Sequence, residues 1–145
     1  MKKLIEITTI AGTAGSGKSR RAVEMALREL PGSVVYVSNA MDKENFASLK
    51  QHTMAEYGII CAPIKYITMG TNVALNKSTV DSLVRAVAHE CVPTVVLDFE
   101  CTPQADVDQL SAKLISDTGV RKIIITRSMI RGDSEHYNEI NAVDV

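Results

Sequence analysis

Apolar residues along this chain gather in short runs that alternate with longer segments in which they recur every three or four positions. The short runs are rich in β-branched and aliphatic side chains, which is typical of strands buried in a sheet. The recurring spacing indicates helices with one apolar face. Strands are expected over residues 4–10, 33–38, 64–69, 94–98 and 120–126.

Start and stop signals place helices between these strands. The first helix is expected over residues 19–30, and the Pro-Gly pair that follows ends it. Asp42 is a suitable N-cap for the second helix, and Gly58 ends that helix. The third opens at Ser78, where the run Ser-Thr-Val-Asp resembles a capping box, and Cys91 falls on its apolar face.

The last helix and the C-terminal segment complete the pattern. Pro103 falls in the first turn of a helix that Gly119 closes. A short polar helix over residues 135–140 is expected to lead to an edge strand over residues 142–145. Strands that alternate with helices predict one α/β domain over residues 1–145, with a mostly parallel sheet of five to six strands and helices on both faces. Ligands of such sheets bind at the carboxyl ends of the strands.

Composition narrows the class of protein. Hydrophobic residues make up 46% of the chain and charged residues 23%, a balance that excludes a disordered or collagen-like chain. The 16 Lys and Arg residues against 17 Asp and Glu residues give a formal net charge of -1, so no overall basic excess indicates nucleic-acid binding. Aromatic residues make up only 4% and Trp is absent, which argues against a surface on which several bases stack.

The cysteines are Cys61, Cys91 and Cys101, an odd number without a Cys-x-x-Cys pair. They match neither a disulfide framework nor a zinc site, so we expect reduced thiols that pack in the interior. No apolar run approaches the roughly 20 residues that span a bilayer, and the N-terminal segment lacks the features of a secretory signal. These features predict a cytoplasmic protein without a membrane partner.

A glycine-rich turn follows the first expected strand and matches the Walker A pattern Gly-x-x-x-x-Gly-Lys-Ser/Thr in full. Glycines allow successive main-chain N–H groups to point at phosphate oxygens at the N-terminus of a helix. Lys18 is expected to reach the β- and γ-phosphates and to act in catalysis, and the Ser19 hydroxyl is expected to bind Mg²⁺. The candidate nucleotide-binding residues are Gly12, Thr13, Ala14, Gly15, Ser16, Gly17, Lys18, Ser19 and Arg20.

Asp98 ends the apolar strand over residues 94–98, the arrangement known as Walker B. A carboxylate at this position holds Mg²⁺, often through water. Ser19 and Asp98 are therefore the expected metal ligands, with Mg²⁺ as the cofactor. Two residues further on, Glu100 is a candidate catalytic base for an attacking water, with a solvated loop position as the alternative.

With these motifs, the chain resembles the RecA-like P-loop ATPases, in particular the cores of DnaB-type replicative helicases and KaiC-type proteins. Residues 38–41, Ser-Asn-Ala-Met, are similar to the Ser-x-Glu-Met that ends the second strand in those helicases. Residues 96–99, Val-Leu-Asp-Phe, are similar to their Walker B strand, and residues 126–131 lie where they carry a strand-end Gln followed by an Arg. The resemblance implies a sheet with its third strand at one edge, followed by the second, fourth, fifth, first and sixth. It also implies an ATPase that acts as an oligomer or on a partner, in processes that involve DNA.

Two positions depart from the pattern of that family. The family's water-activating Glu falls on Ala40, and its Gln that senses the γ-phosphate falls on Ser128. Loss of a general base costs roughly 10²–10⁴ in rate. The resemblance therefore implies ATP binding with slow hydrolysis, unless Glu100, Asp42 or Glu44 substitutes.

The resemblance also bears on partners. The expected small-molecule partner is ATP or another nucleoside triphosphate. Arg127 and Arg131 lie beyond the last of the central strands, where relatives carry basic residues that reach the nucleotide of a neighbouring subunit. In a homo-oligomer either arginine could act in trans, and the alternative is a solvated loop position. DNA is a further expected partner, although the sequence shows no stripe of basic residues.

Two alternatives remain open. A weaker similarity to adenosylcobinamide kinase, carried by residues 16–20, 34–37 and 42–44, implies a small-molecule kinase or nucleotidyltransferase. That family accepts a nucleotide on a histidine one position before His52, where this chain has Gln51. The other alternative is a regulatory module that binds nucleotide without turnover.

Overall fold

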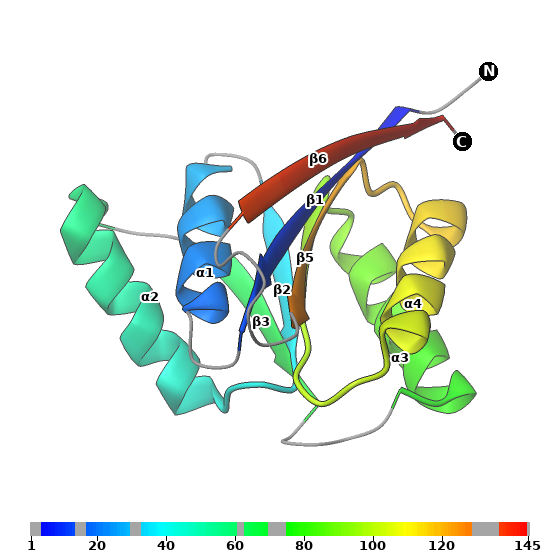
Figure 1. Ribbon diagram of the computed structural model, residues 1–145, viewed down its shortest axis with the longest axis horizontal. Coiled ribbons are helices and arrows are strands. Elements are labelled where there is room, and N and C mark those ends of the chain that lie inside the picture. The colour runs from blue at the N-terminus through cyan, green and yellow to red at the C-terminus, as the bar shows by residue number, and fades with distance from the viewer. Residues whose placement is uncertain are drawn as a thin grey trace.

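The computed structural model describes residues 4–13, 17–29, 33–60, 63–69, 75–128 and 137–144, with the main chain alone for Leu4, Ser128 and residues 137–144. Its strands are β1 (Leu4–Gly12), β2 (Val34–Ser38), β3 (Ile64–Thr68), β4 (Thr94–Asp98), β5 (Lys122–Ser128) and β6 (Tyr137–Asp144). They form one sheet in the order β3-β2-β4-β5-β1-β6 (Figure 1). The first five strands of that order run parallel, and β6 pairs with β1 antiparallel at the edge.

Helices cover both faces of this sheet. The helices of the described residues are α1 (Lys18–Arg28), α2 (Lys43–Tyr57), α3 (Lys77–Glu90) and α4 (Gln104–Asp117). Helices α1 and α2 lie on one face, and α3 and α4 lie on the other (Figure 1). The α/β class and the mostly parallel sheet predicted from the sequence are thus confirmed. No helix in the described part of the chain has the length and apolar character needed to cross a membrane.

The hydrophobic core lies on the two sides of the central strands. Strands β2 and β4 are buried along their full length, as their continuous apolar runs predicted. Alternate residues of a strand point to opposite faces. Val35 and Val37 of β2 therefore pack in the cluster with α3 and α4, whereas Tyr36 packs in the cluster with α1 and α2. The sheet thus separates two apolar layers, and both restrain its central strands.

The order of the strands is the one that the resemblance to RecA-like proteins implied. Strand β4 pairs with β2 and β5, so β5 separates β4 from β1. Because these strands run parallel, their carboxyl ends meet at one edge of the sheet. Strands β1, β2, β4 and β5 end there, at Gly12, Ser38, Asp98 and Ser128 respectively. This edge brings together the glycine-rich turn and the expected metal-binding carboxylate.

The C-terminal segment differs from the prediction. The polar helix expected over residues 135–140 is wrong for the part described, because residues 137–144 form β6. Its residues pair with β1 from Tyr137↔Ala11 to Asp144↔Leu4. The pairing partner lies more than a hundred residues away in the sequence, so local polarity could not reveal the strand.

The ends of α3 also differ from the prediction. Asn76, not Ser78, is the N-cap: its Oδ1 accepts hydrogen bonds from the Thr79 main-chain N–H at 2.9 Å and the Thr79 hydroxyl at 3.0 Å. Cys91 does not lie on the apolar face but is an exposed C-cap with φ of 53°. Cys91 and Cys101 are free, as expected, yet both are exposed rather than packed, and Cys61 lies outside the described residues.

Candidate functional site

The turn between β1 and α1 places Lys18 and Ser19 in the first turn of a helix at the carboxyl edge of the sheet. Gly17 is the N-cap of α1, with φ of 90° and ψ of 25°. This left-handed conformation is strained for a residue with a Cβ atom, so the position favours glycine. Gly12 is buried and Thr13 is half-buried. Ala14, Gly15 and Ser16 lie outside the described residues.

Lys18 is a charged residue that is almost completely buried, with 4% of its surface exposed. Its Nζ donates hydrogen bonds to the main-chain carbonyls of Gly12 at 3.3 Å and Thr13 at 3.2 Å. A buried ammonium group is costly unless polar groups replace its water, and carbonyl oxygens do so here. The Lys18 ammonium group therefore lies against the main chain of Gly12 and Thr13, directly after β1.

Asp98 ends β4 and has no solvent exposure. Its Oδ2 accepts hydrogen bonds from the Ser19 hydroxyl at 2.7 Å and from the Tyr36 hydroxyl at 2.7 Å. Its Oδ1 accepts one from the Thr126 hydroxyl at 3.0 Å. Three hydroxyl groups from α1, β2 and β5 thus compensate the buried carboxylate. The predicted pair of metal ligands, Ser19 and Asp98, is in direct contact.

Burial raises the pKa of the Tyr36 hydroxyl well above its ordinary value, and the nearby charge of Asp98 and their hydrogen bond add to that effect. A tyrosine with a raised pKa keeps its proton throughout the physiological range. Tyr36 is therefore a permanent donor to Asp98. Sequence reasoning gave no role to this side chain or to that of Thr126, although both residues lie in runs that carried the resemblances.

The oxygen atoms of Ser19 and Asp98 fit Mg²⁺, which prefers hard oxygen ligands. No group of three or more His, Cys, Asp or Glu side chains able to hold a metal occurs in the part of the chain described. Mg²⁺ in nucleotide sites is commonly bound by one or two protein oxygens, by phosphate oxygens and by water. Such a site needs no more protein ligands than Ser19 and Asp98 provide.

Asn39 fixes the loop that carries Glu100. The Asn39 side chain is buried, its Oδ1 accepts from the Glu100 main-chain N–H at 2.7 Å, and its Nδ2 donates to the Glu100 carbonyl at 3.2 Å. The same Nδ2 donates to the Thr102 hydroxyl at 3.1 Å. The half-buried Glu100 is therefore on an anchored segment directly after β4. Sequence reasoning assigned no role to Asn39.

The other carboxylates considered as substitutes for the base have different surroundings. Asp42 is the N-cap of α2, and its Oδ1 accepts from the Asn45 main-chain N–H at 2.7 Å. Glu44 is exposed in the first turn of that helix. Ala40, with no carboxylate, donates its main-chain N–H to the Ser38 hydroxyl at 2.9 Å. Asp42 is thus engaged as a cap and Glu44 is exposed, and the role of Glu100 as the base remains a prediction.

The arginines predicted to contact nucleotide lie in separate places. Arg20 donates from Nη2 to Glu56 Oε2 of α2 at 2.8 Å, and this hydrogen bond, with the charge of Glu56, raises its pKa. Arg127 is exposed at the end of β5. Arg131 lies outside the described residues. His52, the residue nearest to the position used by the kinase-like alternative, is exposed on α2. Roles for Arg20, Arg127 and Arg131 remain predictions.

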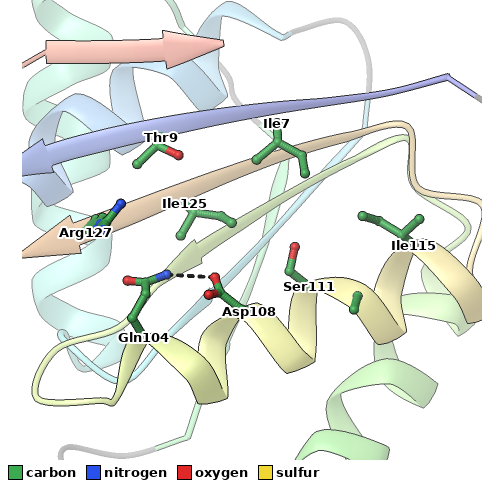
Figure 2. Close-up of a pocket in the computed structure, with 9 residues that line it drawn as sticks. Ile7, Thr9, Gln104, Asp108, Ser111, Ile115, Ile125 and Arg127 are labelled. Atoms are coloured by element: carbon green, nitrogen blue, oxygen red, sulfur yellow. Dashed lines mark hydrogen bonds between the residues drawn. The ribbon is translucent and has the colours of Figure 1, made fainter. Parts of the chain in front are cut away.

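Arg127 lines a hollow of about 360 Å³ together with the α4 residues Gln104 and Asp108. Figure 2 shows how these side chains lie. Ile7 and Ile125 form part of its floor, and they pack in the cluster on the α3 and α4 side of the sheet. Helix α1, which carries Lys18 and Ser19, packs on the opposite face. The hollow is therefore separate from the contacts among Lys18, Ser19 and Asp98.

Comparisons with known proteins show a shared fold. No protein-family model and no curated protein matches the chain. Among solved structures, the chain is similar to SulA from Pseudomonas aeruginosa, with a TM-score of 0.52 and 17% sequence identity over 85% of this chain and 98% of SulA. A likeness at this identity concerns the fold alone.

This finding corrects the family assignment made from the sequence. The identification with RecA-like P-loop ATPases, and the weaker one with adenosylcobinamide kinase, is wrong: the structural similarity is to SulA, and no family model supports either assignment. Apart from the glycine-rich turn, the resemblances were carried by runs of three to six residues, several of them at strand ends. Such short runs follow from the strand-to-turn geometry of an α/β sheet and do not define a family.

Proposed function

We propose that this protein binds a nucleoside triphosphate, ATP or another, together with Mg²⁺ at the turn between β1 and α1. The observation that supports this most is the 2.7 Å hydrogen bond from the Ser19 hydroxyl to Asp98 Oδ2. These residues are 79 positions apart, and each is the type of ligand that a nucleotide-bound Mg²⁺ takes. The proposal concerns the site and makes no claim of family.

Each residue of the site has a chemical role in this proposal. Main-chain N–H groups at the start of α1 donate to phosphate oxygens, which the helix dipole also favours. The Lys18 ammonium neutralises phosphate charge. The Ser19 hydroxyl donates a hydrogen bond to Asp98, which leaves lone pairs of the Ser19 oxygen for the metal. Asp98 would hold the metal directly or through water. Bound Mg²⁺ neutralises charge on the phosphates.

We assign slow hydrolysis to the site, with Glu100 as the base that accepts a proton from the attacking water. The water oxygen forms a bond to the γ-phosphorus as the bond from that phosphorus to the β–γ bridging oxygen breaks, and the nucleoside diphosphate leaves with the bridging oxygen. An arginine that stabilises this step is worth roughly 10³–10⁵ in rate. Of the arginines predicted to contact nucleotide, Arg20 is paired with Glu56 and Arg127 lines the hollow away from α1. We therefore expect low turnover by the isolated chain. An oligomer with an arginine in trans and a DNA partner remain predictions.

Calorimetric titration tests the proposal directly. ATP with Mg²⁺ is expected to bind, and AMP with Mg²⁺ is expected to bind at least about tenfold more weakly, because AMP lacks the phosphates that Lys18 and the metal contact. The Ser19→Ala variant should lose the advantage that Mg²⁺ gives to ATP. No ATP binding, or equal affinities for ATP and AMP, would refute the proposed site.

A further inference from the structure

Tyr36 lies in the middle of β2 and belongs to no nucleotide-binding motif, yet its hydroxyl donates to Asp98 Oδ2 at 2.7 Å. The same oxygen accepts the Ser19 hydroxyl. Thr126 of β5 donates to the other oxygen, Oδ1, at 3.0 Å. Strand β4 lies between β2 and β5, so donors from both neighbouring strands hold the two oxygens of one carboxylate.

We infer that Tyr36, with Thr126, is a positioning residue that orients Asp98 toward the Mg²⁺ of the bound nucleotide. The inference rests on the proposed function, because Asp98 needs a fixed orientation only if it serves a metal. Two donors from opposite sides restrain rotation of the carboxylate plane. Together with Ser19 they keep the buried carboxylate hydrogen-bonded whether or not the metal is bound.

The position of the Tyr36 hydroxyl is itself restrained by packing. Its ring centroid lies 5.0 Å from that of Phe46 in α2 and 5.8 Å from that of Tyr66 in β3. Phe46 and Tyr66 stack on each other at 4.0 Å, with 10° between their planes. The Tyr66 hydroxyl donates to the Met41 carbonyl. Packing in this aromatic cluster thus restrains the ring whose hydroxyl contacts the carboxylate.

The Tyr36→Phe variant removes the hydroxyl and retains the ring that packs in the cluster. Groups that orient a metal ligand typically contribute 10- to 100-fold to metal affinity. We therefore expect Tyr36→Phe to weaken the Mg²⁺ dependence of ATP binding by about tenfold. The affinity for ATP in excess EDTA should change by less than about twofold, because phosphate contacts of the turn are untouched.

Tyr66→Phe is the matched control. It removes a hydroxyl from the same aromatic cluster, but that hydroxyl bonds to Met41 and not to Asp98. A merely structural effect of losing a tyrosine hydroxyl in this cluster would appear in both variants. We expect Tyr66→Phe to keep the Mg²⁺ dependence of the unmodified protein within about twofold, because the Tyr66 hydroxyl gives Asp98 no hydrogen bond that orients it.

A second pair of variants keeps the inference testable if Tyr36→Phe does not fold. Thr126→Val should weaken the Mg²⁺ dependence in the same way, and Thr126→Ser, which retains a hydroxyl, should restore it. Suppose that the unmodified protein binds ATP in a Mg²⁺-dependent manner and that Tyr36→Phe leaves this dependence unchanged. The inference is then overturned and the proposed function stands. Thr126→Val decides in the same way if Tyr36→Phe does not fold. If the unmodified protein binds no ATP, the proposed function fails and the inference with it.

Discussion

Lys18 and Asp98 are both charged and almost without solvent contact, and each is compensated in a different way. Two main-chain carbonyls accept from Lys18, and three hydroxyl groups donate to Asp98. Phosphate oxygens would be better acceptors for the ammonium than carbonyls, because a hydrogen bond between two charged groups is stronger. The buried lysine is therefore suited to exchange its partners when a phosphate binds.

Replacement of this lysine tests that role. Lys18→Ala should weaken ATP binding by roughly 100-fold, because a hydrogen bond between charged groups contributes about 1.5–3 kcal/mol. Lys77→Ala is the matched control, since Lys77 is also the first residue of a helix but is exposed. Titration with labelled ATP measures both affinities. A Lys18→Ala affinity within threefold of the unmodified protein would contradict the role of the turn.

The structure brings together the predicted site residues that a local pattern places at a helix start or at a strand end. Lys18 and Ser19 follow a strand and open a helix, and Asp98 ends a buried strand. Tyr36, Asn39 and Thr126 went unrecognised because their side chains act on partners in neighbouring strands or loops. The order of the strands in the sheet decides which side chains of different strands meet. A single residue does not encode that order.

Caps and apolar runs defined most helices and strands correctly. Asp42 and Gly58 bound α2 as predicted, with Gly58 at φ of 70°. Both work through contacts within a few residues of themselves. The segment that forms β6 has no capping residue of this kind, and it pairs with β1, which is distant in the sequence. This difference explains why the predicted bounds of α2 were confirmed and the helix predicted over residues 135–140 was wrong.

Contacts between elements include an ionic link at the amino end of β5. Lys122 Nζ donates to Glu29 Oε2 at the end of α1 at 2.8 Å and lies 3.5 Å from Glu6 Oε2 of β1. Burial lowers the pKa of Lys122, but the hydrogen bond to Glu29 and the charges of both carboxylates outweigh it, so its pKa is raised. The protonated form of Lys122 thus stabilises the folded state.

This link predicts a dependence of stability on alkaline pH. A raised pKa in the folded state gives a contribution that is complete below the unfolded pKa of about 10.4 and is lost as the pH rises through the folded value. The difference in free energy of unfolding between the unmodified protein and Lys122→Gln should therefore be larger at pH 9 than at pH 11. Urea unfolding at both pH values measures it.

Lys113→Gln is the comparison for that experiment. Lys113 pairs with Asp81 at 3.2 Å on the surface between α4 and α3, where both side chains are exposed. Exposed ion pairs contribute little to stability. Lys113→Gln should therefore change the free energy of unfolding only slightly at both pH values. If Lys122→Gln shows no greater change with pH than Lys113→Gln, the link does not stabilise the fold.

The fold as a unit resembles that of SulA, yet it does not specify what the chain binds. One arrangement of strands and helices hosts many functions, and function is decided by the side chains at the site. The strand order agreed with the expectation drawn from RecA-like proteins while the family assignment did not. Nucleotide binding therefore rests on the Ser19–Asp98 contact and the glycine-rich turn.

Binding at this site should stabilise the entire domain against heat. A ligand confined to the native state adds about 2.7 kcal/mol at a hundredfold excess over its Kd. For a chain of 145 residues this corresponds to an increase in Tm of roughly 5–10 °C. A thermal melt with ATP and Mg²⁺ measures it, with ATP in EDTA and Mg²⁺ alone as controls. An unchanged Tm at millimolar ATP and Mg²⁺ would argue against a tight site.

Local patterns were enough to place the central strands, most helix ends and the residues Lys18, Ser19 and Asp98, because periodicity, capping and strand-end position act over a few residues. The chain in three dimensions was needed for the antiparallel edge strand β6 and for the hydroxyl groups of Tyr36 and Thr126 around Asp98. These features depend on which distant segments become neighbours. Packing of the two faces of the sheet makes that choice, and the free energy of packing is a property of all the elements together.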